Sequence, residues 1–257
     1  MKRRHHCKTS QAKVMLAVLA LCGVTAFWGS VAWAADAGQA PVLVQDGTHY
    51  FSVNPENGNR DKNYNNDGAV GKNSLAVGAG AYADGTMGAT ALGNDAVADG
   101  ERALAVGNGS NATGLDAIAI GTGPQGEANG INAIAIGEQS HAKGMYTTAV
   151  GSYSEATAEG AVALGQQAKS KEECSTSIGI MANGMGEGGT AGKHATAVGA
   201  YSESSGLASS ALGSFSKATE KFATALGYSS GAGLNGTAVG AASQAGGQGG
   251  TAVGILS

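Results

Sequence analysis

Residues 103–121 read ALAVGNGSNATGLDAIAIG and contain one complete repeat unit between Gly107 and Gly121. An alternating segment, A-x-A-(aliphatic)-G, ends at each of these glycines, and a second one, G-x-x-(S/A)-x-(A/S)-x-G, lies between them. Alternation with a period of two indicates β-strands, and a glycine after each segment favours a turn. The 14-residue unit therefore predicts one coil with two strands of about four residues and two turns.

The unit recurs along most of the chain. The glycine that ends the first segment is repeated at Gly78, Gly93, Gly107, Gly121, Gly137, Gly151, Gly165, Gly179, Gly199, Gly213, Gly227, Gly240 and Gly254. Most successive glycines are 14 residues apart, which identifies an internal repeat. The chain has 44 glycines, 5% aromatic and 13% charged residues. It therefore has too few large apolar side chains to fill a thick globular core. The pattern predicts an all-β parallel β-roll of about thirteen stacked 14-residue coils, each adding about 4.8 Å.

Alternation assigns the side chains of each coil to faces. With the recurring glycine as position 1, positions 4, 6, 11 and 13 are nearly always Ala, Ser or Gly. These positions share one side of their strands, so we expect them in a narrow interior between two sheets. Positions 5 and 7 are mostly polar, as at Asn111 and Thr113, and we expect them to face solvent.

Position 14 is aliphatic in every copy, and alternation places it on the outside of its sheet. The column consists of Val77, Leu92, Val106, Ile120, Ile136, Val150, Leu164, Ile178, Val198, Leu212, Leu226, Val239 and Val253. A stripe this long would be a large apolar patch on a monomer, so we expect it to form the interface of an oligomer. The alternative is inverted alternation, with these aliphatic side chains filling the roll.

The sequence resembles the YadA-like head repeats of trimeric autotransporter adhesins. The resemblance rests on NSLAVG at 73–78 and the G-x-x-S-x-A-x-G segments, and it covers about residues 69–257. It implies a left-handed roll, three chains around a threefold axis, and an outer-membrane protein whose head attaches to matrix proteins such as collagen. Combined with the alternation argument, this threefold count predicts that the position-14 column is the trimer interface.

Two departures from the family pattern stand out. The family continues into a neck, a stalk and a β-barrel anchor, whereas this chain stops at Ser257. We expect a truncated reading frame; a head that is released, or held by another chain, is the alternative. In addition, the coils at 121–136 and 179–198 carry two and six extra residues, which we expect to be extruded as loops that are either functional or merely tolerated.

The N-terminus predicts export. A basic, acid-free stretch at 1–13 precedes an apolar run at 14–31 and an A-x-A site at 32–34, the three parts of a signal peptide. We expect cleavage after Ala34, with an uncleaved membrane anchor or a lipoprotein signal at Cys22 as alternatives. The domains are then a signal peptide (1–34), cap strands with a polar linker (35–68) and the head repeats (69–257). We expect the mature chain at the cell surface or outer membrane, or secreted if it has no anchor.

No catalytic or cofactor-binding constellation emerges. His49, His141 and His194 are far apart in sequence, and Cys174 would be left alone after cleavage, so no metal or cofactor is expected. Hexapeptide acyltransferases share the (aliphatic)-G-x-x-(S/A) unit, but their coil has a period of 18. The net charge of −4 gives no reason to expect nucleic acid. We expect a non-catalytic adhesin head; an architectural surface or biofilm protein and a β-solenoid enzyme are the alternatives.

Overall fold

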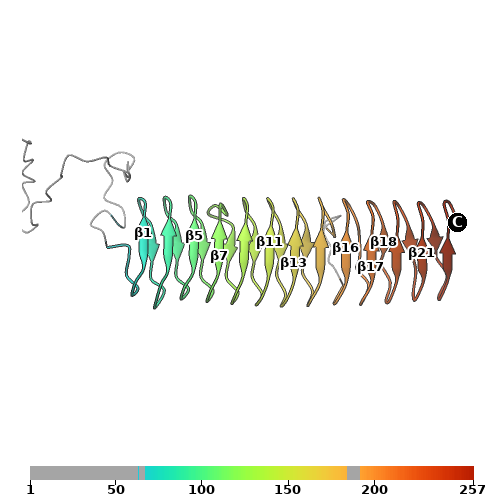
Figure 1. Ribbon diagram of the computed structural model, residues 1–257, viewed down its shortest axis with the longest axis horizontal. Coiled ribbons are helices and arrows are strands. Elements are labelled where there is room, and N and C mark those ends of the chain that lie inside the picture. Colours follow the sequence, from blue (N-terminus) through green and yellow to red (C-terminus); the bar gives the residue numbers. More distant parts are fainter. Residues whose placement is uncertain (1–62, 64–66, 184–191) are drawn as a thin grey trace, which may run out of the picture. The chain divides into compact units, whose positions relative to one another are not determined.

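The computed structural model describes residue 63 and residues 67–183 and 192–257. Within this part, coils stack one behind the next along a single direction (Figure 1). The expected signal peptide and cap strands lie outside the described residues. In the described part, no helix is long and apolar enough to cross a membrane.

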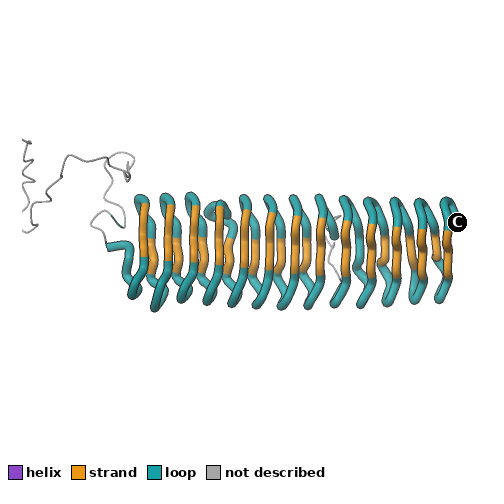
Figure 2. Tube along the Cα trace, viewed as in Figure 1, coloured by secondary structure: helices purple, strands orange, loops and turns teal. Residues whose placement is uncertain are grey.

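Every coil contributes a strand to one long sheet, and most coils contribute a second strand to the opposite side, with turns joining the two (Figure 2). The long sheet has 13 strands: β1 (Leu75–Val77), β3 (Thr90–Leu92), β5 (Leu104–Val106), β7 (Ile118–Ile120), β9 (Ile134–Ile136), β11 (Thr148–Val150), β13 (Val162–Leu164), β15 (Thr176–Ile178), β16 (Thr196–Val198), β17 (Ser210–Leu212), β19 (Thr224–Leu226), β21 (Thr237–Val239) and β23 (Thr251–Val253). The opposite side is divided into a seven-stranded and a three-stranded sheet. The seven strands are β2 (Tyr82–Ala83), β4 (Val97–Ala98), β6 (Asn111–Ala112), β8 (Glu127–Ala128), β10 (His141–Ala142), β12 (Glu155–Ala156) and β14 (Lys169–Ser170). The three strands are β18 (Lys217–Ala218), β20 (Gly231–Ala232) and β22 (Gln244–Ala245).

All strand pairs are parallel, and equivalent positions of successive coils face each other. Ile118, Ala119 and Ile120 of β7, for example, pair with Ile134, Ala135 and Ile136 of β9. The strands have three and two residues, shorter than the four expected, because the turns take up the rest of each coil. The all-β parallel solenoid predicted from the repeat is confirmed.

The interior is built from alanine and serine, as the alternation predicts. Ala119 and Ala135 of the long sheet and Ala112 and Ala142 of the opposite side are all fully buried. Serine is accepted at position 4 because its hydroxyl donates a hydrogen bond to the carbonyl of the coil's own first glycine, as in Ser154 Oγ to Gly151 O at 2.8 Å. The inverted alternation, with aliphatic side chains inside, is therefore excluded.

The two turns of each coil repeat the same backbone conformation. We call the turn at positions 1–3 the first corner and the turn at positions 8–10 the second corner. Positions 3 and 10 are left-handed in nearly every described coil even where the residue is not glycine, as at Tyr153 (φ 59°) and Tyr146 (φ 60°). Stacking compensates this strain: the amide of Tyr146 donates to the carbonyl of Ile131 one coil earlier, at 2.8 Å.

Glycine has a different role at each of the two corners. The position-1 glycines have positive φ, as in Gly213 (φ 134°). Gly114, at position 8, has no such φ, but a Cβ there would lie 2.0 Å from the carbonyl oxygen of Gly130 in the next coil. The first corner thus needs glycine for its backbone conformation. At the second corner glycine permits close stacking in coils such as 107–120, whereas other coils have Ala158, Glu172 or Glu220 at position 8.

The coil with the six-residue insertion lies between β14 and β18, where the short-strand side is divided into two sheets. Asn183 in this coil makes hydrogen bonds through its side chain that a short strand would make through its backbone. Its side chain is buried inside the roll, where Nδ2 donates to Ser177 Oγ at 2.7 Å. The backbone amide of Ser204 donates to Asn183 Oδ1 at 2.6 Å. The amide side chain therefore satisfies a backbone group that a neighbouring strand would otherwise satisfy.

We expect Asn183→Ala to lower the free energy of unfolding by about 1–3 kcal/mol, because the buried amide of Ser204 and the hydroxyl of Ser177 would each lose a partner. Urea denaturation followed by circular dichroism measures this difference. The matched control is Asn108→Ala, since Asn108 is exposed in the first corner of its coil. Equal stability of the two variants would show that Asn183 does not hold the interrupted coil together.

The shorter insertion, at 121–136, is absorbed without breaking a sheet, because β8 still pairs with β10. Gly126 stands at interior position 4 of this coil, where other coils have Ser or Ala. The side chain of Thr122 fills the space that a side chain at position 4 would occupy. A Cβ on Gly126 would lie 2.7 Å from Thr122 Cβ, and Thr122 is fully buried. The two extra residues therefore enlarge the first corner and leave the stack intact.

Candidate self-association surface

The aliphatic column at position 14 lies on the outer face of the long sheet. In most of its strands the central alanine is buried while the residues on either side are partly exposed, as in β7 and β9. Exposure of the column rises towards the C-terminus, where Leu212 is 38% and Leu226 is 43% exposed. All thirteen predicted interface residues are placed in this one face by the parallel register.

Position 12 adds a second column on the same face, and its chemistry changes along the stack. It is aliphatic in several of the first coils, as at Leu104, Ile118 and Ile134. From Thr176 onwards it is Thr or Ser in every described coil. The apolar face of the long sheet is therefore two residues wide in much of the N-terminal part and one residue wide in the C-terminal part.

The opposite side of the coils carries charges that pair from one coil to the next. Lys143 Nζ lies 2.7 Å from Glu127 Oε1, and Lys171 Nζ lies 2.5 Å from Glu155 Oε2. Burial raises the pKa of Glu127, but its contacts with Lys143 and Asn129 lower it by more, so the pKa lies below its ordinary value. Paired, partly exposed charges of this kind are suited to solvent, in contrast to the apolar long sheet.

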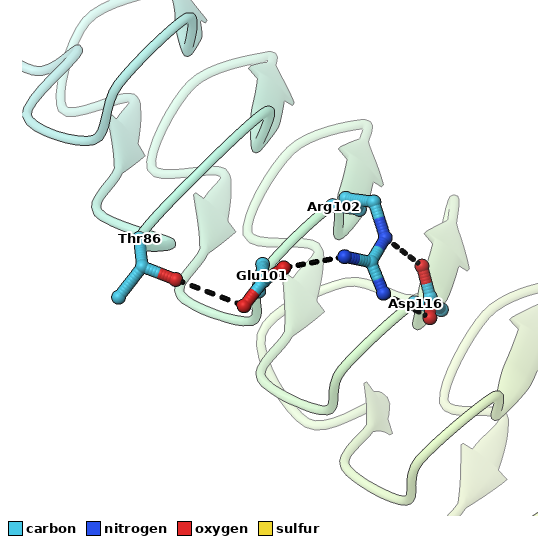
Figure 3. A network of polar contacts seen from close by, with 4 residues as sticks. All are labelled: Thr86, Glu101, Arg102 and Asp116. Atoms are coloured by element: carbon cyan, nitrogen blue, oxygen red, sulfur yellow. Dashed lines mark hydrogen bonds and ion pairs between the residues drawn. The ribbon is translucent and has the colours of Figure 1, made fainter.

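A polar network at the second corner also joins successive coils (Figure 3). Thr86 Oγ1 donates to Glu101 Oε2 at 3.1 Å, and Glu101 accepts from Arg102. The Arg102 guanidinium then forms a bidentate pair with Asp116, with Nε–Oδ1 at 2.6 Å and Nη2–Oδ2 at 2.7 Å. The hydrogen bonds from Arg102 hold the pKa of the Asp116 carboxyl below its ordinary value. Three coils are linked through side chains at this corner.

We expect the Asp116 carboxyl to titrate below its ordinary pKa in the parent chain and to shift upwards in Arg102→Gln. Because the folded-state pKa is depressed, the pair stabilises the fold above the ordinary aspartate pKa, and this contribution is lost as the pH falls through the folded value. Carboxyl chemical shifts measured by NMR against pH check the shift. An unchanged Asp116 titration in Arg102→Gln would contradict the pairing.

The described residues offer no site for metal chemistry. No group of three or more His, Cys, Asp or Glu side chains that could hold a metal is found in this part of the chain. His141 lies on the polar side near Glu127, with Nδ1 3.8 Å from Oε1, and His194 lies at a second corner. Cys174 is a free, exposed thiol. The structure does not bring these side chains together.

Aromatic side chains form a further feature that the alternation argument missed. Tyr201 and Phe215 stack at the first corner with ring centroids 5.1 Å apart, and Tyr228 meets Phe215 edge-on at 5.9 Å. Aromatic residues of the repeats fall at positions 2, 3 or 10, with Tyr82 as the exception. This restriction to the corners was visible in the sequence once the unit had been numbered.

These features define a class of protein: a parallel β-solenoid with a polar side and a continuous apolar side. The YadA head domain repeat family matches residues 69–96, 87–110, 98–123, 128–154, 156–183 and 204–230, which together make up more than half of the chain. The chain belongs to this family, as the sequence resemblance indicated. The family is one of non-enzymatic adhesins, so membership implies an adhesin-type function.

Comparison with solved structures finds the crystal structure of the collagen-binding domain of the Yersinia adhesin YadA. The sequences are 25% identical, the match covers 62% of this chain and 68% of that chain, and the TM-score is 0.32. Comparison with curated proteins gives no match.

Proposed function

We propose that the chain is the head of a homotrimeric adhesin, exported to the cell surface, that attaches the cell to matrix proteins such as collagen or to other cells without catalysing a reaction. The observation that carries this proposal is the unbroken aliphatic column on the outer face of the long sheet. Only assembly would remove such a face from water.

The interior of the roll and the aliphatic column differ in how much apolar area they can bury. The roll buries mainly alanine and serine, which contribute little apolar area. Completing the burial of a partly exposed Val, Leu or Ile adds up to about 1 kcal/mol. The thirteen side chains of the column together contribute a favourable free energy of burial that the Ala/Ser interior does not supply. We therefore expect the chain to be stably folded when it is assembled.

The proposed arrangement also assigns the outward surface. With the three long sheets facing a common axis, the opposite side of each roll, with its paired lysines and glutamates, is turned towards the surroundings. Contacts with a matrix protein would then form on this side or at the corners. The threefold count and the collagen-type target come from the family resemblance, and the basic, apolar and A-x-A segments at 1–34 support export.

Binding of the mature chain to immobilised collagen and other matrix proteins, measured by surface plasmon resonance, tests the adhesive role. Saturable binding by the trimer, with none by an equally sized non-adhesive trimer, is the expected result. A trimer that binds no matrix protein and mediates no attachment of cells would contradict this role and favour an architectural surface protein.

A further inference from the structure

Three consecutive coils differ from the rest at their corners. In coils 199–212, 213–226 and 227–239 the first corner carries Tyr201, Phe215 and Tyr228, and the second corner carries Leu207, Phe222 and Leu234. Among the coils that the structure describes, these three have a large apolar side chain at both corners. Several of them are well exposed, with Phe215 at 42%, Phe222 at 57% and Tyr228 at 60%.

The apolar corners coincide with the narrow part of the aliphatic face. The strands that end these three coils, β17, β19 and β21, begin with Ser210, Thr224 and Thr237 at position 12. Earlier strands have Leu104, Ile118 or Ile134 at that place. The three coils with apolar corners thus lie within the part of the sheet, from Thr176 onwards, in which position 12 is polar.

The two corners also lie where a second copy would meet them. A cyclic assembly is heterologous, so one patch of each protomer contacts a different patch of the next. When three parallel long sheets surround one axis, the carboxyl end of each strand lies beside the amino end of a strand in the neighbouring protomer. The first corner follows the carboxyl end of the long-sheet strand, and the second corner precedes the amino end.

We infer that Tyr201, Phe215 and Tyr228 of one protomer pack against Leu207, Phe222 and Leu234 of its neighbour and form an aromatic clasp at each of the three edges of the trimer. The occupant of this surface is a second copy of the chain, because the surface continues the aliphatic column. In each coil position 14 is followed directly by the first corner, as Leu212 is followed by Gly213, Ser214 and Phe215. This inference rests on the proposed trimer.

The clasp adds apolar area to the interface in coils whose long sheet carries a single aliphatic column. The rings of Tyr201 and Phe215 are already held face to face with an interplanar angle of 4°, so little side-chain freedom remains to be lost on association. Aromatic side chains with few rotatable bonds are effective anchors at protein interfaces for this reason. The exposed edges of these aromatic rings then pack against Leu207, Phe222 and Leu234 of the neighbouring protomer.

Cross-linking of the exported chain in a Cys174→Ser background tests the clasp. The variant Phe215→Cys with Phe222→Cys is treated with a short bismaleimide, and the products are separated on a denaturing gel. The two positions lie at opposite corners of one coil, roughly 10 Å or more apart across the strands, so efficient linkage joins neighbouring protomers. The expected product is a covalent trimer, since each of the three edges gains a bridge.

Two controls make the outcome specific. Phe222→Cys with Lys217→Cys moves one thiol from the first corner to the polar side, and this pair is expected to lose the trimer band. The pair Tyr201→Cys with Leu207→Cys repeats the test one coil earlier, so a folding defect of the first pair, seen by circular dichroism, leaves a second measurement.

The outcomes separate the clasp from the proposed trimer. If the untreated variants sediment as trimers and neither corner pair gives the covalent trimer, the clasp is overturned while the trimeric head stands. If the parent chain sediments as a stable monomer, the proposed function fails and the clasp fails with it. A trimer that cross-links at the corners and not at Lys217 supports both.

Discussion

The double variant Ile120→Asp with Ile136→Asp is expected to remain monomeric under conditions in which the parent chain forms a trimer. The two side chains are adjacent in the register of β7 and β9 on the outer face of the long sheet. In a trimer, six carboxylates would meet near one axis without cationic partners, and burying unpaired charges costs several kcal/mol each. Sedimentation equilibrium measures the loss of assembly.

The control for this variant is Asn111→Asp, which introduces one carboxylate on the polar side at β6. Asn111 is partly exposed at position 5 and lies next to Glu127 and Val97 in the neighbouring coils. This variant is expected to keep the trimer. If the isoleucine variant assembled as well as Asn111→Asp, the aliphatic column would not be the interface.

Gly213→Ala is expected to lower the free energy of unfolding by on the order of 3 kcal/mol. Gly213 has φ 134°, a backbone conformation that L-residues with a side chain rarely adopt. The added Cβ would also lie 2.3 Å from the carbonyl oxygen of Gly227 in the next coil, so the backbone of both coils would have to move. Thermal and urea denaturation of the variant measure the effect.

Gly246→Ala is the control, because an added Cβ at Gly246 meets nothing within 4 Å and its backbone is not left-handed. Alanine there is expected to leave stability nearly unchanged. Equal losses in the two variants would indicate that glycine is needed in general for flexibility of the chain, and not at position 1 for its turn conformation.

The repeat fixes much of this fold because each coil must satisfy the same constraints as its neighbours. A residue such as Ala119 is buried in the structure as its alternation predicts, since a one-residue shift would turn every side chain to the other face. The same regularity places Ile120 outside. For this reason the coil number, the parallel sheets and the alanine interior could all be derived from the period and the parity.

The features that the sequence did not reveal depend on contacts between particular coils. In the sequence Asn183 is one of several polar residues near an insertion. In the structure it is buried, and its side chain accepts the hydrogen bond from the Ser204 amide that a strand carbonyl would otherwise accept. Tyr146 and Phe222 adopt the left-handed backbone conformation that usually favours glycine. They can do so because their amides donate hydrogen bonds to carbonyls of the preceding coil. The aromatic stack likewise arises between coils, from residues 14 or so apart.

We expect the aliphatic column to be buried by other copies of the chain. Sedimentation equilibrium of the mature chain over a wide range of concentration tests it most directly. We expect a single species with three times the mass of one chain, which dissociates only as it unfolds. A folded, stable monomer with the column exposed to water would contradict the account.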